Sequence, residues 1–256
     1  MSKSNISIMS LNLLTSGLHL PGNPPFKKRI TSINEMIHLY KPDIIGVQEL
    51  TEKMTPYLDD LLQTYSISGE PRHSKVSNES CCILFNKEKF ELLEERTIWL
   101  SNTPLQKGSK HPLSQFPRIV SYVYLKDKKT NHTYSIYNTH LDSNFSLVRS
   151  FQAQALSQII QDTQKGTYTI LTGDFNCNSL SPAYKIIQAP FIDLIDDSFG
   201  TTLRGFIGSL RFHHIPIDHI FVSKNLKSIS VKRITSKFSG MHPSDHYPVF
   251  AKIQTK

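Results

Sequence analysis

The chain has 256 residues, of which 38% are hydrophobic and 20% are charged. This length and composition are typical of a protein with a substantial core, and they exclude a chain that is mainly disordered. Lys and Arg (29) outnumber Asp and Glu (21), giving a formal net charge of +8. The excess points to an anionic substrate or partner, and a generally basic proteome is the competing explanation.

Apolar residues never run for the roughly 18–20 positions that a membrane-spanning helix needs, and Ser and Asn interrupt the N-terminal segment MSKSNISIMSLNLL. We therefore expect neither a signal peptide nor a membrane span. The three cysteines, Cys81, Cys82 and Cys177, offer no disulfide framework, which favours a reducing compartment. We expect a cytoplasmic monomer.

No repeat, linker or low-complexity tract divides the chain, so we predict a single domain over residues 1–256. The N-terminal part predicts a βαβ unit, because a helical stripe of Ile and Tyr lies between two apolar strands. Its parts are a strand over 5–13, a Gly- and Pro-rich loop over 17–25, a helix over 30–40 and a strand over 43–50.

The middle of the chain predicts antiparallel strands over 80–87, 89–100, 118–127 and 133–142, the last two joined by a hairpin at 128–132. A helix follows over 146–164, with Leu147, Phe151, Ala155 and Ile159 as its apolar stripe and Gly166 as its C-cap. The remaining elements are strands over 167–176, 218–223, 228–234 and 249–254, and a short helix beginning at Ser181. This mixture predicts an α/β (α+β) fold in which helices cover a four-layer sandwich of two mixed sheets.

Polar residues end several of these apolar strands. A lone Asp at a strand end is more often a turn or cap residue, but the repetition here favours a functional site. The positions concerned are Asn12, Glu49, His140, Asp142, Asp174, Asn176, Asp218, Asp245 and His246.

These residues lie in six short motifs, which occur in the order SLN, QE, NTHLD, GDFN, IDHIF and SDHYP. The series resembles the endonuclease/exonuclease/phosphatase family, also described as DNase I-like. The segments WLSNTP (99–104) and PRI (117–119) are similar to compact bacterial members of that family. The resemblance implies two central sheets flanked by helices and a metal-dependent hydrolase of phosphate esters.

The resemblance also implies a role for each residue. Glu49 is the principal metal ligand, with Asn12 and Asp245 beside it. Asp174 deprotonates the attacking water and Asn176 positions that water or a phosphate oxygen. His246 faces the phosphate with its tautomer set by Asp218, His140 binds a phosphoryl oxygen with Asp142 behind it, and Arg118 is a candidate phosphate-binding residue.

Phosphate ester hydrolysis needs a cation at the phosphoryl oxygens and a positioned water, and carboxylate and amide oxygens suit Mg²⁺ or Mn²⁺. Without the five carboxylates of this set, the net charge of +8 becomes +13. We therefore expect an acidic, metal-binding centre within a basic periphery, which would attract a polyanionic substrate.

Other interpretations of the sequence compete with this one. The histidines 213, 214, 219, 242 and 246 could form a zinc cluster, but no CxxC or HExxH motif accompanies them. Cys177 follows GDFN and could be a nucleophile, although we favour a packing role. Phe26, Tyr57, Phe116 and Phe206 could stack on bases, and core positions are the commoner alternative. Lys27, Lys28 and Arg29 are interpreted as a solvated helix start.

The substrate class stays open between nucleic acid or nucleotide, which we favour, and an inositol or lipid headgroup phosphate. QELT (48–51) departs from the QETK of the abasic-site endonucleases, and GDFN departs from the GDTN of the tyrosyl-DNA phosphodiesterases. An inactive module that binds nucleic acid is the alternative from another class, but binding alone needs no complete set of catalytic residues.

Overall fold

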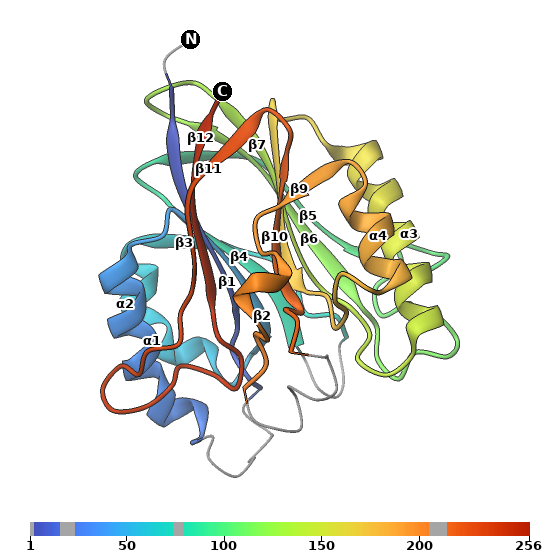
Figure 1. Cartoon of the computed structure of the whole chain (residues 1–256), viewed down its shortest axis with the longest axis horizontal. Coiled ribbons are helices and arrows are strands. Elements are labelled where there is room, and N and C mark those ends of the chain that lie inside the picture. The colour runs from blue at the N-terminus through green and yellow to red at the C-terminus, as the bar shows by residue number, and fades with distance from the viewer. Residues whose placement is uncertain (1–2, 16–23, 74–78, 205–213) are drawn as a thin grey trace.

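The computed structural model describes residues 3–15, 24–73, 79–204 and 214–256. These residues form two sheets of six strands each, which face one another (Figure 1). The first sheet has the order β11-β12-β1-β2-β4-β3, with strands β1 (Asn5–Asn12), β2 (Ile44–Thr51), β3 (Tyr65–Ser68), β4 (Glu79–Asn86), β11 (Leu226–Arg233) and β12 (Val249–Thr255). The second has the order β5-β6-β7-β8-β10-β9, with strands β5 (Phe90–Trp99), β6 (Ile119–Asp127), β7 (Thr133–His140), β8 (Tyr168–Asp174), β9 (Phe191–Asp193) and β10 (Asp218–Ser223).

Helices cover the outer face of each sheet, so the predicted four-layer sandwich is confirmed. Figure 1 shows α1 (Phe26–Tyr40) and α2 (Asp59–Leu62) on one outer side and α3 (Ser146–Thr163) and α4 (Pro182–Gln188) on the opposite side. Two short 3₁₀ turns complete the described elements, η1 (Thr55–Tyr57) and η2 (Asp197–Phe199).

Alternation along each strand divides the apolar residues between three buried layers. In β1, Ile6 and Ile8 pack into the layer between the sheets, whereas Met9 and Leu11 pack into the layer that contains Ile33 of α1. A third layer lies under α3 and α4. Because strands inside this sandwich are covered on both faces, all seven residues of β8 are buried.

Two parallel strand pairs position the site. β1 and β2 are parallel and connected through α1, as the βαβ pattern predicts. β7 and β8 are also parallel, connected through α3, with His140 paired in register with Asp174. Such a pair carries its C-terminal residues to the same edge of the sheet, so the two pairs gather the polar strand ends predicted from the sequence.

The predicted stripe and cap of the 146–164 helix need correction. Leu147 is 80% exposed, and α3 instead buries a face that includes Val148, Ala153, Leu156 and Ile160. A spacing of four residues advances by about 40° at each step, so a stripe with that spacing leaves one face of a helix. α3 ends at an extended Gln164. Gly166 is not its cap: a Cβ there would lie 2.5 Å from the backbone nitrogen of Ser135, so this position needs glycine for close approach.

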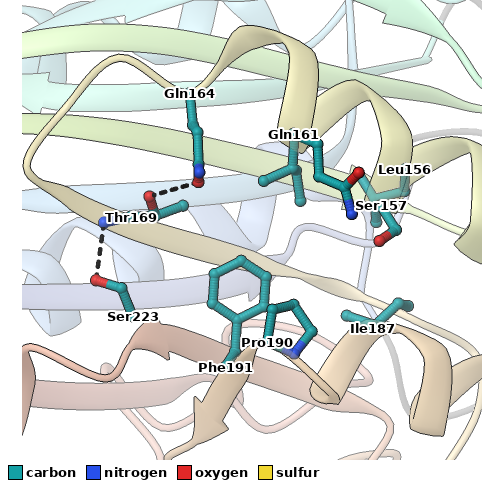
Figure 2. Close-up of a pocket in the computed structure, with 10 residues that line it drawn as sticks. Leu156, Ser157, Gln161, Gln164, Thr169, Ile187, Pro190, Phe191 and Ser223 are labelled. Carbon is teal, nitrogen blue, oxygen red and sulfur yellow. Dashed lines mark hydrogen bonds between the residues drawn. The ribbon is translucent and has the colours of Figure 1, made fainter.

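A cavity of about 230 Å³ lies on the outer side of the second sheet and is lined by residues of α3 and by Ile187, Pro190 and Phe191. Figure 2 shows these lining side chains. None of the helices in the described segments is both long and apolar enough to cross a bilayer. Cys81, Cys82 and Cys177 are buried and free. The short strands β3 and β9 were not predicted, because three or four residues are too few to establish a period.

Candidate active site

The polar residues at the ends of four strands converge at one edge of the sandwich. Asp174, the last residue of β8, pairs in register with His140 of β7 on one side and with Asp218 of β10 on the other. Asn12, the last residue of β1, reaches across from the first sheet and donates to Asp174 Oδ2 (3.0 Å). Asn12, His140, Asp174 and Asp218 are therefore brought together, as the motif order predicts.

Glu49 joins the site through a β-bulge. The register between β2 and β4 shifts between Val47 and Leu50, and Glu49 within this bulge has a φ of 62°. This conformation is unfavourable for a residue with a Cβ, and such outliers cluster at functional sites. The carboxylate accepts hydrogen bonds from Asn12 Nδ2 (3.0 Å) and from the backbone nitrogen of Thr15 (2.7 Å).

Asn12 bridges two of the carboxylates. Its amide nitrogen donates to both Glu49 Oε1 and Asp174 Oδ2, while its amide oxygen accepts from the backbone nitrogen of Leu14 (2.9 Å). In this arrangement the nitrogen, not the oxygen, faces the acidic cluster. Its role as a metal ligand stays a prediction, and it would require the amide to turn over.

The carboxylates are held together at an electrostatic cost. Burial raises the pKa of Glu49, and the nearby Glu79 and Asp245 raise it further. Burial and Asp218 raise the pKa of Asp174 to about 7. Both shifts mean that the ionised forms are penalised, because buried anions lose hydration and repel one another. A divalent cation would remove this penalty.

His246 and Asp218 form a buried pair. His246 Nδ1 lies 2.8 Å from Asp218 Oδ2, and its Nε2 lies 3.7 Å from Asp174 Oδ2. Burial lowers the pKa of His246, but Asp218 and Asp174 more than reverse this effect, and the pKa lies well above its usual value. The imidazole is therefore held as a cation whose Nε2 side faces the cluster.

His140, unlike His246, is held in its neutral form. Burial lowers its pKa well below the usual value, and Arg118 and Arg72 lower it further. Its Nε2 lies 2.9 Å from Asn176 Nδ2, which also donates to the carbonyl of Leu141 (3.2 Å). Since the amide nitrogen can only donate, the neutral ring accepts at Nε2 and carries its proton at Nδ1. Asn176 thus connects His140 to the site.

Arg118 faces the same cluster from β6's N-terminal side. It is 6% exposed and lines a small hollow with Glu49, Arg72 and His140. Its Nε and Nη1 atoms are buried without a hydrogen-bond partner among the described residues. A buried guanidinium with unused donors beside a carboxylate cluster has the chemistry to bind an anion.

Asp142 and Asp245 lie further from the centre. Asp142 accepts from Ser114 Oγ (2.7 Å) and from the backbone nitrogens of Asn144 and Phe145, so its described hydrogen bonds hold the turn before α3 rather than His140. Asp245 is partly exposed, accepts from Ser244 Oγ (3.1 Å), and is close enough to raise the pKa of Glu49.

Arg29 is a residue whose role the sequence interpretation missed. It was interpreted as part of a solvated helix start, but it is 1% exposed. Its guanidinium donates to the carbonyls of Pro24, Leu13, Leu14 and Pro243, which ties the end of β1 to the loop that carries Asp245 and His246. Burial lowers its pKa to about 10, although Asp245 and Glu49 oppose this. Arg29 lies one residue before Ile30, outside the apolar stripe of the predicted helix, so its position in the sequence did not predict burial.

The oxygen-rich donor set fits a hard divalent cation such as Mg²⁺ or Mn²⁺. Glu49 and Asp245 stay the predicted carboxylate ligands, and the pKa of Glu49 is raised by Asp245. Asp174, Asp218 and His246 form a second group, with ligand atoms within 4.8 Å of one another. This is the one such group of three or more acidic, His or Cys residues within the described segments, so no zinc-type histidine cluster accompanies it there.

The histidines, the cysteine and the aromatic residues of the competing interpretations lie mostly away from the site or outside the described residues. His219 pairs with Asp193 (2.8 Å) in the core, and His213 and Phe206 lie outside the described residues. His214 is exposed, and no contact with the site is described for it. Burial raises the pKa of Cys177 to about 12, which argues against a thiolate nucleophile. Phe26 packs in the core against Tyr57.

Comparison with known proteins supports the same conclusion. The model of the endonuclease/exonuclease/phosphatase family matches residues 9–246. One similar solved structure is a family protein from Bacteroides thetaiotaomicron, with 24% sequence identity, 100% of both chains covered and a TM-score of 0.85. Another is the mannosyl-6-phosphatase Bt3783 of that organism, with 24% identity, 97% of this chain and 99% of that chain covered and a TM-score of 0.82. TDP2 of D. rerio with a single-strand DNA product is more distant, with 18% sequence identity, 98% of this chain and 99% of that chain covered and a TM-score of 0.74. The chain belongs to the endonuclease/exonuclease/phosphatase family and is a hydrolase of phosphate ester bonds.

Proposed function

We propose that the protein is a Mg²⁺- or Mn²⁺-dependent phosphoesterase whose substrate is a nucleic acid or a nucleotide. The observation that carries the reaction class is the convergence of Glu49, Asp174, the Asp218–His246 pair and His140 at one edge of the sandwich. The chemical basis is that hydrolysis of a phosphate ester needs negative groups that hold a cation beside positive groups that meet the phosphate.

In this proposal Glu49 holds the metal, with Asp245 and Asn12 beside it. The cation, when bound, polarises the phosphoryl oxygen and offsets the charge that develops on it. Asp174 orients the attacking water and accepts its proton. Burial and Asp218 raise the pKa of Asp174, and a raised pKa makes a carboxylate a stronger base. Asn176 positions the water or a phosphate oxygen.

Three basic groups would contact the phosphate. His246, kept protonated by Asp218, faces the phosphate through Nε2 and offers both a positive charge and a proton. His140, kept neutral, faces the site through Nε2, and it would bind a phosphoryl oxygen there by carrying its proton on that nitrogen in place of the contact with Asn176. Arg118 has buried, unused donors in the adjoining hollow. Asp142 supports this region from behind through Ser114 and the turn before α3.

The preference for nucleic acid or nucleotide rests on charge. The net charge of +8 includes the carboxylates of the site, so the rest of the surface is more basic still. A small phosphorylated metabolite is a second candidate, because the mannosyl-6-phosphatase aligns with almost the whole chain. Inositol and lipid headgroup phosphates share the same chemistry and belong in the test.

The test is hydrolysis across a panel, with either Mg²⁺ or Mn²⁺. The panel contains single-stranded and duplex DNA, RNA, mononucleotides, sugar phosphates, inositol phosphates and lipid headgroup phosphates. We expect turnover of a nucleic acid or nucleotide that EDTA abolishes and metal restores. Turnover confined to sugar or inositol phosphates would contradict the substrate assignment, and metal-independent turnover would contradict the mechanism.

Salt dependence separates a polymer from a small substrate. Binding of a ten-nucleotide single strand to inactive Asp174→Asn should weaken with salt by about 0.7 log units per log unit for each phosphate contacted. We expect a slope that corresponds to several phosphates. A slope near one, with turnover of a mononucleotide by the parent enzyme, would indicate a small-molecule phosphatase.

A further inference from the structure

A second hollow adjoins the active site. The small hollow that contains Glu49, Arg118 and His140 is also lined by Arg72. Arg72 in turn lines a larger hollow of about 200 Å³, together with His73, Lys110, Gln115 and Phe116. The two hollows therefore share Arg72 as a lining residue, and residues of the segment 116–119 line one or the other, so the hollows are neighbours.

The larger hollow is basic and has an aromatic wall. The Arg72 guanidinium lies 4.8 Å from the centre of the Phe116 ring and forms an ion pair with Glu79 (2.9 Å). The hydrogen bond from Trp99 Nε1 to the Arg72 carbonyl (2.9 Å) holds the backbone at this point. Arg72 is thus fixed in place by three different contacts.

Lys110 supplies charge that no described carboxylate neutralises. Its ammonium group donates to the backbone carbonyls of Ser114 (2.8 Å) and Gln115 (3.1 Å). An ammonium group has three N–H donors, so one remains for a ligand. The residues that line this hollow include no Asp or Glu, which makes it attractive to an anion.

The size of the hollow limits what can enter. Pockets for drug-sized ligands occupy about 300–1,000 Å³. A hollow of about 200 Å³ therefore suits one small anionic group with part of a ring, rather than several nucleotides. Arg118, whose Nε and Nη1 are buried without a hydrogen-bond partner among the described residues, lines the small hollow together with Arg72 and Glu49.

We propose that this hollow, lined by Arg72, His73, Lys110, Gln115 and Phe116, binds a second phosphate group of the substrate while the scissile phosphate lies at the catalytic centre. The inference rests on the proposed function, because it assumes a phosphorylated substrate there. The second phosphate can belong to a small bisphosphorylated molecule or be the next phosphate of a nucleic acid strand.

The direct test is ligand binding with a matched pair of lysine variants. Adenosine 3′,5′-bisphosphate and adenosine 5′-monophosphate are titrated into Asp174→Asn with Mg²⁺, so that neither ligand is consumed. We expect the bisphosphate to bind about tenfold more tightly, the scale of one charge-assisted hydrogen bond. Adding Lys110→Met should reduce this advantage to less than about threefold.

Lys107→Met is the control. Lys107 is exposed on the same loop, pairs with Glu70 (2.8 Å) and does not line the hollow. It should leave the bisphosphate advantage unchanged. Equal affinities for the two ligands, or the same effect from both lysine variants, would overturn the proposal. Because Lys110 is exposed and both its bonds are to backbone, its replacement should not prevent folding.

Binding of a ten-nucleotide single strand shows whether the second phosphate comes from a nucleic acid or from a small molecule. If a nucleic acid supplies it, Lys110→Met should lower the salt slope of ten-nucleotide binding by about 0.7. If a small molecule supplies it, only the adenosine bisphosphate should lose affinity. Failure of the proposed function is seen separately, as absence of turnover by the parent enzyme across the panel, while the difference between bisphosphate and monophosphate binding tests the hollow alone.

Discussion

The side-chain nitrogen of Asn138 in β7 donates to the backbone carbonyl of Val47 in β2 at 2.8 Å, and so joins one sheet to the other. The same nitrogen donates to the carbonyl of Cys82 in β4 (2.9 Å), and its amide oxygen accepts from Gln48 Nε2 (2.7 Å). These contacts lie where the β2–β4 register shifts. Asn138 therefore satisfies the backbone groups beside the bulge that carries Glu49.

We predict that Asn138→Ala destabilises the protein by about 3 kcal/mol. The substitution would remove the side-chain donor to the buried carbonyls of Val47 and Cys82, and each buried group left without a partner costs about 1–3 kcal/mol. The Gln48 amide would lose one acceptor and keep its bonds to Ser10 and to the Gly46 carbonyl. Turnover should fall as well, because Glu49 would lose the support of its bulge. Urea unfolding and steady-state kinetics measure the two effects. The exposed Asn144→Ala should change neither one. Equal stabilities of the two variants would show that the contact across the sheets is dispensable.

Glu49→Gln should abolish activity while folding persists, because it keeps the shape of the ligand and removes its charge. Isothermal titration should show the Mg²⁺ affinity collapsing. In the absence of metal the variant should be as stable as the parent or more stable, because burial and the neighbours Glu79 and Asp245 penalise the ionised Glu49. If the variant binds Mg²⁺ as tightly as the parent, Glu49 is not the ligand.

Asp174→Asn and His246→Ala should each lower turnover by about a hundredfold or more, with little change in substrate binding. Asp218→Asn should have a similar effect to His246→Ala, because it removes the group that holds the imidazole at Nδ1. The variant that combines Asp218→Asn with His246→Ala should be no worse than either alone. Losses that simply multiply would mean that the two residues act independently.

The Asp193–His219 pair should make stability depend on pH. Burial lowers the pKa of His219, but Asp193 at 2.8 Å raises it more, and the resulting pKa is above the usual value of about 6.5. A raised folded-state pKa means that the stabilisation is complete below about pH 6.5 and is lost as the pH rises through the folded-state value. The free energy of unfolding should therefore fall as the pH rises above about 6.5.

Urea unfolding at several pH values measures this effect. Asp193→Asn should remove the part of the slope that comes from His219, since it removes the charge that raises the pKa of that residue, while the raised pKa of His246 keeps a slope of the same sign. It also weakens the acceptor of the Tyr184 hydroxyl (2.8 Å), so some pH-independent loss is expected. The exposed Asp162→Asn should retain the slope of the parent. A slope that Asp193→Asn leaves unchanged would refute the assignment to this pair.

Local sequence patterns determined most of the elements. Alternation over residues 5–13 and apolar spacing over 30–40 correctly predicted β1 and α1, because these periods follow from the geometry of a single strand or helix. Asn12, His140 and Asp174 were predicted at strand ends, and the two parallel strand pairs bring these ends to one edge, while the roles of the site residues stay predictions. The apolar stripe predicted for α3 was wrong, because residues spaced by four do not stay on one face of a helix with 3.6 residues per turn.

The tertiary structure decided the charge states and the supporting contacts. The sequence contains two histidines beside acidic motifs, but only the packing makes His246 a cation against Asp218 and leaves His140 neutral beside Arg118. Likewise, Arg29 begins as one of three consecutive basic residues, and only the fold surrounds it with four carbonyls. Desolvation and contacts between residues distant in sequence depend on the whole fold, so no local pattern encodes them.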